Sequence, residues 1–222
     1  MTIRVLVADD QAMIRGALAG LLDLERDIEV VAQAADGVQT LEELARLASA
    51  DDPSGASDLS DPARASAPVD VAIIDIEMPR MDGITATQAI RSRFPGVRVL
   101  IVTTFGRPGY LQRALDAGAT GFMVKDAPVE TLADGVRTVA AGGRAIDQSL
   151  ALEALSAGSS PLTDREADVL REVEGGGTIA DIAHSLGLSQ GTVRNHVSSS
   201  MLKMDARTRA EAASLARAAG WL

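Results

Sequence analysis

The chain contains no cysteine, so neither a disulfide bond nor a thiolate zinc site can stabilise it. Aromatic residues make up only 2% of the 222 residues, while hydrophobic residues make up 46%. The cores must therefore be built from Ala, Val, Leu and Ile. No apolar run is long enough to span a bilayer, and the first ten residues lack the apolar core of a signal peptide. These absences predict a cytoplasmic protein without a membrane partner.

Positive charge is also scarce, because the formal net charge is −10. The acidic excess lies mostly in the first 160 residues, since residues 161–222 carry seven Lys or Arg against eight Asp or Glu. From Thr178 onward, five basic residues stand against three acidic ones. The total charge argues against a nucleic-acid partner for the first part of the chain. It says little about the second part.

The first 141 residues alternate between short apolar runs, typical of buried strands, and segments with helical spacing. Five strand–helix units in series predict an α/β fold: a flavodoxin-like parallel sheet with order 2-1-3-4-5 and helices on both faces. Residues 49–70 are rich in Asp, Ser, Pro and Ala, and we expect a mobile polar loop there. The expected strands are residues 3–8, 28–34, 69–75, 97–104 and 121–125, and the expected helices are residues 12–23, 38–48, 84–94, 109–118 and 129–143.

A low-complexity run, SAGSSP, indicates a linker over residues 142–160, and the chain beyond it has helical spacing throughout. Residues 179–204 have the pattern of a helix-turn-helix, in which Gly187 permits the turn and Ser189 caps the second helix. The expected helices are residues 163–174, 179–186, 190–204 and 207–219.

The outer face of the second helix of this pair carries small, polar and singly charged side chains. Such a face is typical of a recognition helix in a DNA major groove. The alternative is a small interaction bundle in which Arg194 is merely solvated. The side chains expected to face DNA are Gln190, Gly191, Thr192, Arg194, Asn195, Ser198, Ser199 and Lys203.

Acidic side chains follow two of the expected strands, with Asp9 and Asp10 after the first and Asp75 after the third. Ligands of a doubly wound sheet bind beyond the carboxyl ends of its strands, so these carboxylates should converge. Like charges at such close range need a cation, and oxygen-only ligands suit Mg²⁺. Asp75 would then stay ionised and act as a nucleophile. Thr103 and Lys125 end the fourth and fifth strands, where a hydroxyl and an ammonium group suit phosphate oxygens.

Each of these residues also has an ordinary structural explanation. Asp9 and Asp10 could cap a helix, and Lys125 could be a solvated strand end. Only their joint placement at successive strand ends favours a phosphoacceptor site. A phosphatase with an aspartyl nucleophile is a further alternative, although such enzymes usually carry the nucleophile on the first strand.

The motifs VADD, DIEMPRMDG, VTT and AGATGFMVKDAP, in this order and spacing, resemble the receiver domain of bacterial two-component response regulators. The resemblance covers residues 1–141 and implies that a sensor histidine kinase phosphorylates Asp75. The Mg²⁺ ligands that it implies are Asp9, Asp10, Asp75 and the backbone carbonyl of Glu77. The phosphate-reading switch that it implies is Thr103, Phe122 and Lys125.

The segments PLTDREADVLREVEGG and ARTRAEAASLARAAGW resemble the LuxR/NarL-type output domain over residues 161–222. The full chain therefore resembles a response regulator of the NarL/FixJ family, closest to the DesR-like subgroup. This resemblance implies a phosphorylation-dependent homodimer that binds double-stranded promoter DNA and regulates transcription, without being an enzyme. A receiver that signals through protein contacts, with the helical tail as an interaction module, is the competing hypothesis.

Overall fold

The computed structural model describes residues 2–51, 67, 69–104 and 106–222 of the chain. It divides into two compact units: residues 1–106 with 113–148, and residues 107–112 with 149–222. Among the helices of the described residues, none is long and apolar enough to cross a membrane.

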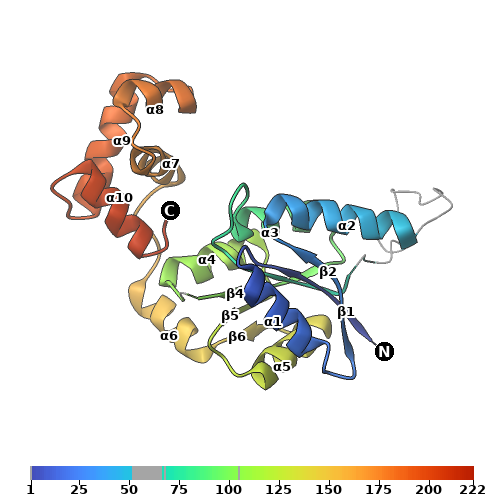
Figure 1. Cartoon of the computed structure of the whole chain (residues 1–222). Coiled ribbons are helices and arrows are strands. Elements are labelled where there is room, and N and C mark those ends of the chain that lie inside the picture. The colour runs from blue at the N-terminus through green and yellow to red at the C-terminus, as the bar shows by residue number, and fades with distance from the viewer. Residues whose placement is uncertain (1, 52–66, 68, 105) are drawn as a thin grey trace. The chain divides into compact units, whose positions relative to one another are not determined.

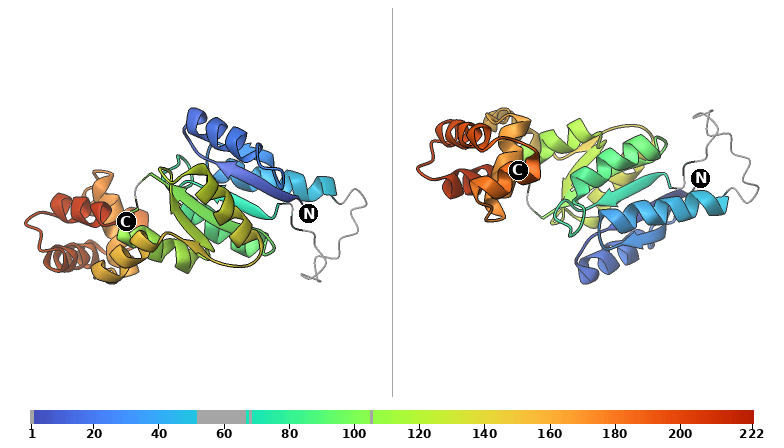
Figure 2. Two further views of the ribbon diagram at one scale, coloured as in Figure 1. Left: turned by 90° about the horizontal axis from the view of Figure 1, so that it is seen from below. Right: turned by 90° about the horizontal axis from the view of Figure 1, so that it is seen from above.

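A parallel sheet with helices on both faces forms the first unit (Figure 1). The strands are β1 (Ile3–Ala8), β2 (Ile28–Ala34), β3 (Val71–Ile74), β4 (Arg98–Thr103), β5 (Gly121–Val124) and β6 (Ala145–Ile146). The helices that follow the strands are α1 (Ala12–Leu22), α2 (Gly37–Asp51), α3 (Gly83–Arg93), α4 (Pro108–Ala117) and α5 (Val129–Ala140). Helices α1 and α5 cover one face of the sheet, and α2 and α3 cover the other (Figure 2).

The strand order is β2-β1-β3-β4-β5-β6, so the predicted order 2-1-3-4-5 is confirmed. The predicted count of five strands is wrong, because β6 pairs with β5 through Gly121 and Phe122. Two residues are too few to give a period in the sequence, and β6 forms because β5 offers it an open edge. β6 and α6 (Gln148–Ala157) both lie within residues 142–160, the segment predicted as a linker.

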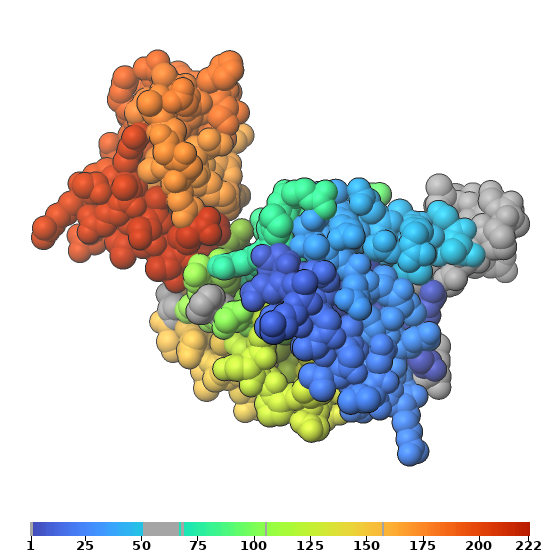
Figure 3. Space-filling view, in the orientation of Figure 1, coloured from blue at the N-terminus to red at the C-terminus, as the bar shows by residue number. Residues whose placement is uncertain are grey.

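Burial explains why the central strands form where they do. Every side chain of β3 is buried, as expected of a parallel strand covered on both faces. Helix α1 packs onto the sheet through Ala19 and Leu22, and its outer side lies on the surface (dark blue in Figure 3). A Cβ atom on Gly83 would lie 2.0 Å from the carbonyl oxygen of Asp75, so glycine lets α3 begin directly against the end of β3.

The loop expected over residues 49–70 begins later than predicted, whereas its other end agrees with the prediction because β3 starts at Val71. Helix α2 continues to Asp51, because its helical pattern runs on into the polar segment. At the other end Val69 is buried, and the Arg4 backbone N–H donates to the Asp70 carboxylate at 2.7 Å. Residues 52–66 and 68 lie outside the described residues, so the expected mobility there stays a prediction.

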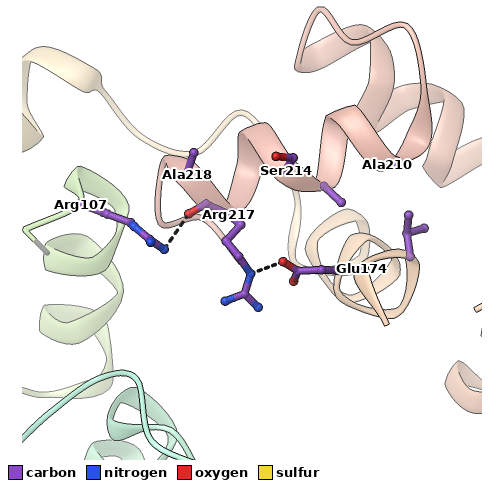
Figure 4. Close-up of a pocket in the computed structure, with 8 residues that line it drawn as sticks. Arg107, Glu174, Ala210, Ser214, Arg217 and Ala218 are labelled. Atoms are coloured by element: carbon purple, nitrogen blue, oxygen red, sulfur yellow. Dashed lines mark hydrogen bonds and ion pairs between the residues drawn. The ribbon is translucent and has the colours of Figure 1, made fainter. Parts of the chain in front are cut away.

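The second unit contains the four helices expected from the sequence. They are α7 (Asp164–Glu174), α8 (Ile179–Leu186), α9 (Gln190–Lys203) and α10 (Arg209–Ala218). Their apolar faces share one core, and Gly187 turns the chain between α8 and α9 with a left-handed φ of 64°. Arg217 of α10 forms an ion pair with Glu174 of α7 (Figure 4).

Candidate functional site

Three carboxylates converge at the carboxyl edge of the sheet, where β1 and β3 are neighbours. One oxygen atom from each of Asp9, Asp10 and Asp75 lies within 4.8 Å of the other two. Asp9 and Asp75 are buried, with 1% and 5% of their surface exposed, whereas Asp10 is exposed. The structure thus brings together the three side chains that the sequence placed at two separate strand ends.

Lys125 supplies positive charge to this acidic pocket. Its Nζ atom lies 2.7 Å from Oδ2 of Asp9 and 2.9 Å from Oδ2 of Asp75. The Lys125 backbone N–H donates to the Thr103 carbonyl at 2.8 Å, which fixes the ends of β4 and β5 beside each other. One ammonium group therefore bridges two buried carboxylates. The sequence placed Lys125 at this edge, but it gave no sign of the contact with Asp9.

This pocket holds one ammonium group for three carboxylates, so its positive charge does not balance its negative charge. Burial raises the pKa of the Asp75 carboxyl, and the nearby charge of Asp9 adds to the rise, while Lys125 offsets only part of it. Burial alone would lower the pKa of Lys125, but its contacts with Asp9 and Asp75 raise it. A further cation would stabilise both ionised carboxylates.

The donor set of the pocket fits Mg²⁺. It consists of carboxylate oxygens, without imidazole or thiolate groups among the three clustered side chains, and such hard ligands suit this cation. The Ile76 backbone N–H donates to Oδ1 of Asp75 at 2.8 Å, and this hydrogen bond orients the carboxylate. Glu77 is the residue that follows Ile76. The Glu77 side chain is exposed, and its backbone carbonyl is the ligand that the resemblance to receiver domains implies.

An ion pair that the sequence analysis missed holds the loop after β3, which carries Glu77. Nε of Arg80 donates to Oδ2 of Asp36 at 2.8 Å, and its guanidinium makes a second contact with the same oxygen. Asp36 is buried, which disfavours its charged form, yet the Gln39 backbone N–H and Arg80 hold the pKa of Asp36 below its usual value. An acid two residues after the end of β2, at the same edge of the sheet as Asp9, was the signal that the sequence offered.

The backbone around this ion pair is tightly constrained. Arg80 has a φ of 60°, a left-handed conformation that costs a non-glycine residue energy. The Gly37 backbone N–H donates to the Met81 carbonyl at 3.1 Å, and a Cβ atom on Gly37 would lie 2.7 Å from the Met81 side chain. The turn between β2 and α2 therefore anchors the loop between β3 and α3.

Thr103 and Phe122, the other two residues of the predicted switch, lie on β4 and β5. Thr103 is 2% exposed at the end of β4. Phe122 is fully buried, and it pairs with Ile101 of β4 and Ile146 of β6 in the sheet. Phe122 is therefore a core residue between β4 and β6, and its role in the switch stays a prediction.

The outer face of α9 carries most of the predicted DNA-facing side chains. Nη2 of Arg194 lies 3.3 Å from Oε1 of Gln190, one turn earlier. The hydroxyl of Thr192, by contrast, lies 2.9 Å from the hydroxyl of the capping residue Ser189. The exposed residues of the predicted set are Gln190, Gly191, Arg194, Asn195, Ser198 and Lys203. The first five lie on the outer face, and Lys203 lies at the C-terminal end of α9.

Ser199 and Lys203 contact Glu166 of α7 instead. The Ser199 hydroxyl donates to Oε1 of Glu166 at 2.6 Å, and Nζ of Lys203 donates to Oε2 at 2.6 Å. The Thr163 backbone N–H donates to the same carboxylate at 2.7 Å, as part of the capping box of α7. Burial opposes the charged form, but Lys203, Ser199 and Thr163 together lower the pKa of Glu166 to about 2.

Comparisons with known proteins place both units. The family model for the response regulator receiver domain matches residues 5–137, and the model for bacterial regulatory proteins of the luxR family matches residues 160–216. The chain is 39% identical over 220 residues to the uncharacterized transcriptional regulatory protein YvfU of Bacillus subtilis (strain 168), covering 99% of this chain and 100% of that one. It is 38% identical over 219 residues to the transcriptional regulatory protein DesR of the same strain, covering 99% and 98%.

Solved structures show the same arrangement of elements. The response regulator ChrA of a heme-sensing two-component system is 30% identical, with a TM-score of 0.53 and coverage of 100% of this chain and 99% of that chain. A structure of two RcsB dimers bound to two parallel DNAs gives a TM-score of 0.62 at 21% identity, with coverage of 98% and 99%. At that identity the second likeness shows the fold alone.

Proposed function

Since the chain belongs to the two-component response regulators of the NarL/FixJ type, with a receiver domain and a LuxR-type DNA-binding domain, we propose that phosphorylation of Asp75 controls its binding to promoter DNA. The phosphodonor is a sensor histidine kinase. The observation that carries the proposal is the convergence of Asp9, Asp10 and Asp75 around the ammonium group of Lys125.

Asp75 is the nucleophile of the phosphoryl transfer. Its Oδ1 accepts the Ile76 N–H, which leaves Oδ2 as the oxygen that faces Lys125. Oδ2 attacks the phosphorus, and the bond from the phosphorus to the histidine nitrogen of the kinase breaks. Asp9, Asp10, Asp75 and the Glu77 carbonyl would hold Mg²⁺. When bound, Mg²⁺ neutralises carboxylate charge and the charge that develops on the transferring phosphoryl oxygens.

Lys125 responds to the phosphorylation of Asp75, because its ammonium group contacts both Asp9 and Asp75 and can shift between them. A phosphoryl group on Asp75 adds a charge of about −1.5 to −2 and three strong acceptor oxygens. Lys125 then moves its contact from Asp9 and the Asp75 carboxylate towards the phosphate, and the Thr103 hydroxyl donates to another phosphate oxygen. The shift repacks the ends of β4 and β5 around Phe122, and this rearrangement favours the dimer.

DNA binding depends on dimerisation because α9 carries little positive charge on its outer face. Arg194 is the one cation among the five outer-face residues of α9, so a monomer releases few counterions and binds weakly. Two linked half-sites bind far more tightly than either one alone. Phosphorylation therefore sets promoter occupancy by setting the amount of dimer.

The proposal is tested with the full-length chain, Mg²⁺ and acetyl phosphate as a small phosphodonor. A DNA duplex is first selected from a random library with the phosphorylated wild-type protein. Sedimentation velocity should then show a dimer only after phosphorylation, and affinity for the selected duplex should rise with it. An unphosphorylated chain that is already fully dimeric and binds equally well would contradict the proposal.

A further inference from the structure

We propose that Glu166 positions the recognition helix α9, and that Ser199 and Lys203 act through Glu166 and not on DNA. This inference rests on the proposed DNA-binding function. It changes which side chains of α9 read the groove, because Ser199 and Lys203 belong to the set that the sequence places against DNA.

The first step is the direction in which these side chains point. Successive residues of an α-helix are about 100° apart, so Ser199 and Lys203 lie roughly 120° and 160° around α9 from the line through Arg194 and Ser198. Both reach the same carboxylate on α7, at 2.6 Å each. The polar atoms of Ser199 and Lys203 that are bonded to Glu166 are not directed at a groove on the Arg194 side of α9.

The second step is the charge of Lys203. Its ammonium group lies against Glu166, a carboxylate with 4% of its surface exposed. Releasing Lys203 to a DNA phosphate would leave that carboxylate buried without its cation, which is costly. The positive charge of Lys203 is thus neutralised within the domain and contributes little to counterion release.

The third step is what Glu166 holds in place. Its carboxylate accepts the Thr163 N–H at the start of α7 and, at the same time, two side chains from successive turns of α9. Val193, Val197 and Ser200 bury the neighbouring side of α9, but an apolar surface is non-directional and leaves the rotation of a helix loosely set. The two hydrogen bonds to Glu166 fix that rotation, and with it the direction of Arg194.

The test separates contact with DNA from positioning. Affinity of the full-length, phosphorylated chain for a random-sequence duplex is measured as a function of salt concentration. The slope of log K against log salt falls by about 0.9 for each phosphate contact that is lost. Lys203→Met, which keeps the length of the side chain, should leave this slope unchanged, whereas the matched control Arg194→Met should lower it.

The positioning of α9 by Glu166 is measured as the sequence specificity of DNA binding. Glu166→Ala should lower the ratio of affinities for the selected and the random duplex by about tenfold, while the salt slope stays unchanged. The double variant Glu166→Gln, Lys203→Gln replaces the ion pair with a neutral hydrogen bond and should restore most of the ratio. Circular dichroism at the assay temperature verifies that each variant is folded, and a variant that unfolds is measured at a lower temperature.

A slope that falls in Lys203→Met as much as in Arg194→Met would overturn the inference and leave the proposed function standing. So would a Glu166→Ala variant that is less stable but keeps the wild-type specificity ratio, because Glu166 would then be merely structural. A wild-type chain that binds no duplex at all would contradict the proposed function, and this inference with it.

Discussion

Two contacts between a lysine and a buried carboxylate in this chain have opposite electrostatic outcomes. In the receiver unit, the ammonium group of Lys125 contacts both Asp9 and Asp75. Burial still raises the pKa of Asp75. In the helical unit, Glu166 receives Lys203, Ser199 and Thr163, and its pKa is lowered to about 2.

The difference lies in the number of donors for each carboxylate. Glu166 has more partners than its single charge requires, so it gains nothing from a further cation and serves the structure. The pair Asp9 and Asp75 has fewer partners than its charges require, so it gains from a divalent cation and keeps an oxygen available for chemistry. Incomplete compensation is what the proposed phosphoacceptor site needs, and complete compensation is what a positioning carboxylate such as Glu166 needs.

Removing the shared cation of the receiver pocket should have the largest effect on function. In Lys125→Met, Asp75 keeps its nucleophilic oxygen and its Mg²⁺ ligands, so acetyl phosphate should still label the protein. The phosphorylation-dependent dimer should be lost, because the group that reads the phosphate is gone. Sedimentation velocity of the labelled variant measures this, and a normal dimer would show that Lys125 only balances charge.

Removing the carboxylate of the helical unit should have the largest effect on stability. Glu166→Ala leaves the Lys203 ammonium without its partner and opens the capping box, at a cost of about 3 kcal/mol. Glu166→Gln keeps the capping hydrogen bonds and should lose less. Denaturant unfolding followed by circular dichroism at neutral pH measures both variants, and an Ala variant as stable as the Gln variant would contradict the role of the capping box.

The same residue gives a pH dependence with a definite sign. The folded pKa of Glu166 is about 2 and its ordinary value is 4.5, so its contribution is fully present above pH 4.5. Over this shift of the pKa, about 3 kcal/mol of the free energy of unfolding is lost as the pH falls from 4.5 through the folded pKa of Glu166. The stability difference between wild type and Glu166→Gln should therefore shrink steadily below pH 4.5, and a constant difference would contradict the low pKa.

Breaking the Asp36–Arg80 ion pair should have a smaller effect, confined to the receiver pocket. The pair anchors the loop that carries Glu77, so Asp36→Asn should weaken Mg²⁺ binding by roughly tenfold, as for other residues that orient metal ligands. Titration calorimetry with Mg²⁺ measures this. Arg80→Gly is the matched variant, since it removes the guanidinium and relieves the left-handed φ; wild-type affinity in this variant would show that the ion pair is dispensable.

The sequence predicted the fold and the acidic pocket well because both rest on regular patterns. Four strand ends carry chemically matched groups, and parallel strands bring such ends to one edge of a sheet. Short-range signals are weaker: β6 is two residues long, and α6 lies in the segment that the sequence predicts as a linker.

The sequence could not predict which side chains form ion pairs with Asp9, Asp36 and Glu166. Lys125 is far from Asp9 in the chain, and Arg80 lies 44 residues beyond Asp36. The pattern T-x-x-E at Thr163–Glu166 was a visible capping-box signal. It did not reveal that the same glutamate would also accept two side chains from α9, because helical spacing alone does not give the rotation of α9 against α7.

The most direct measurement identifies the residue that carries the phosphate. Wild-type protein is treated with acetyl phosphate and Mg²⁺, the acyl phosphate is trapped by borohydride reduction, and peptides are mapped by mass spectrometry. Labelling should occur at Asp75 in the wild type and in Lys125→Met, and it should disappear in Asp75→Asn, which keeps the shape of the side chain but removes the nucleophile. Label at wild-type level on another residue of Asp75→Asn, or a wild-type label at any site other than Asp75, would contradict the account.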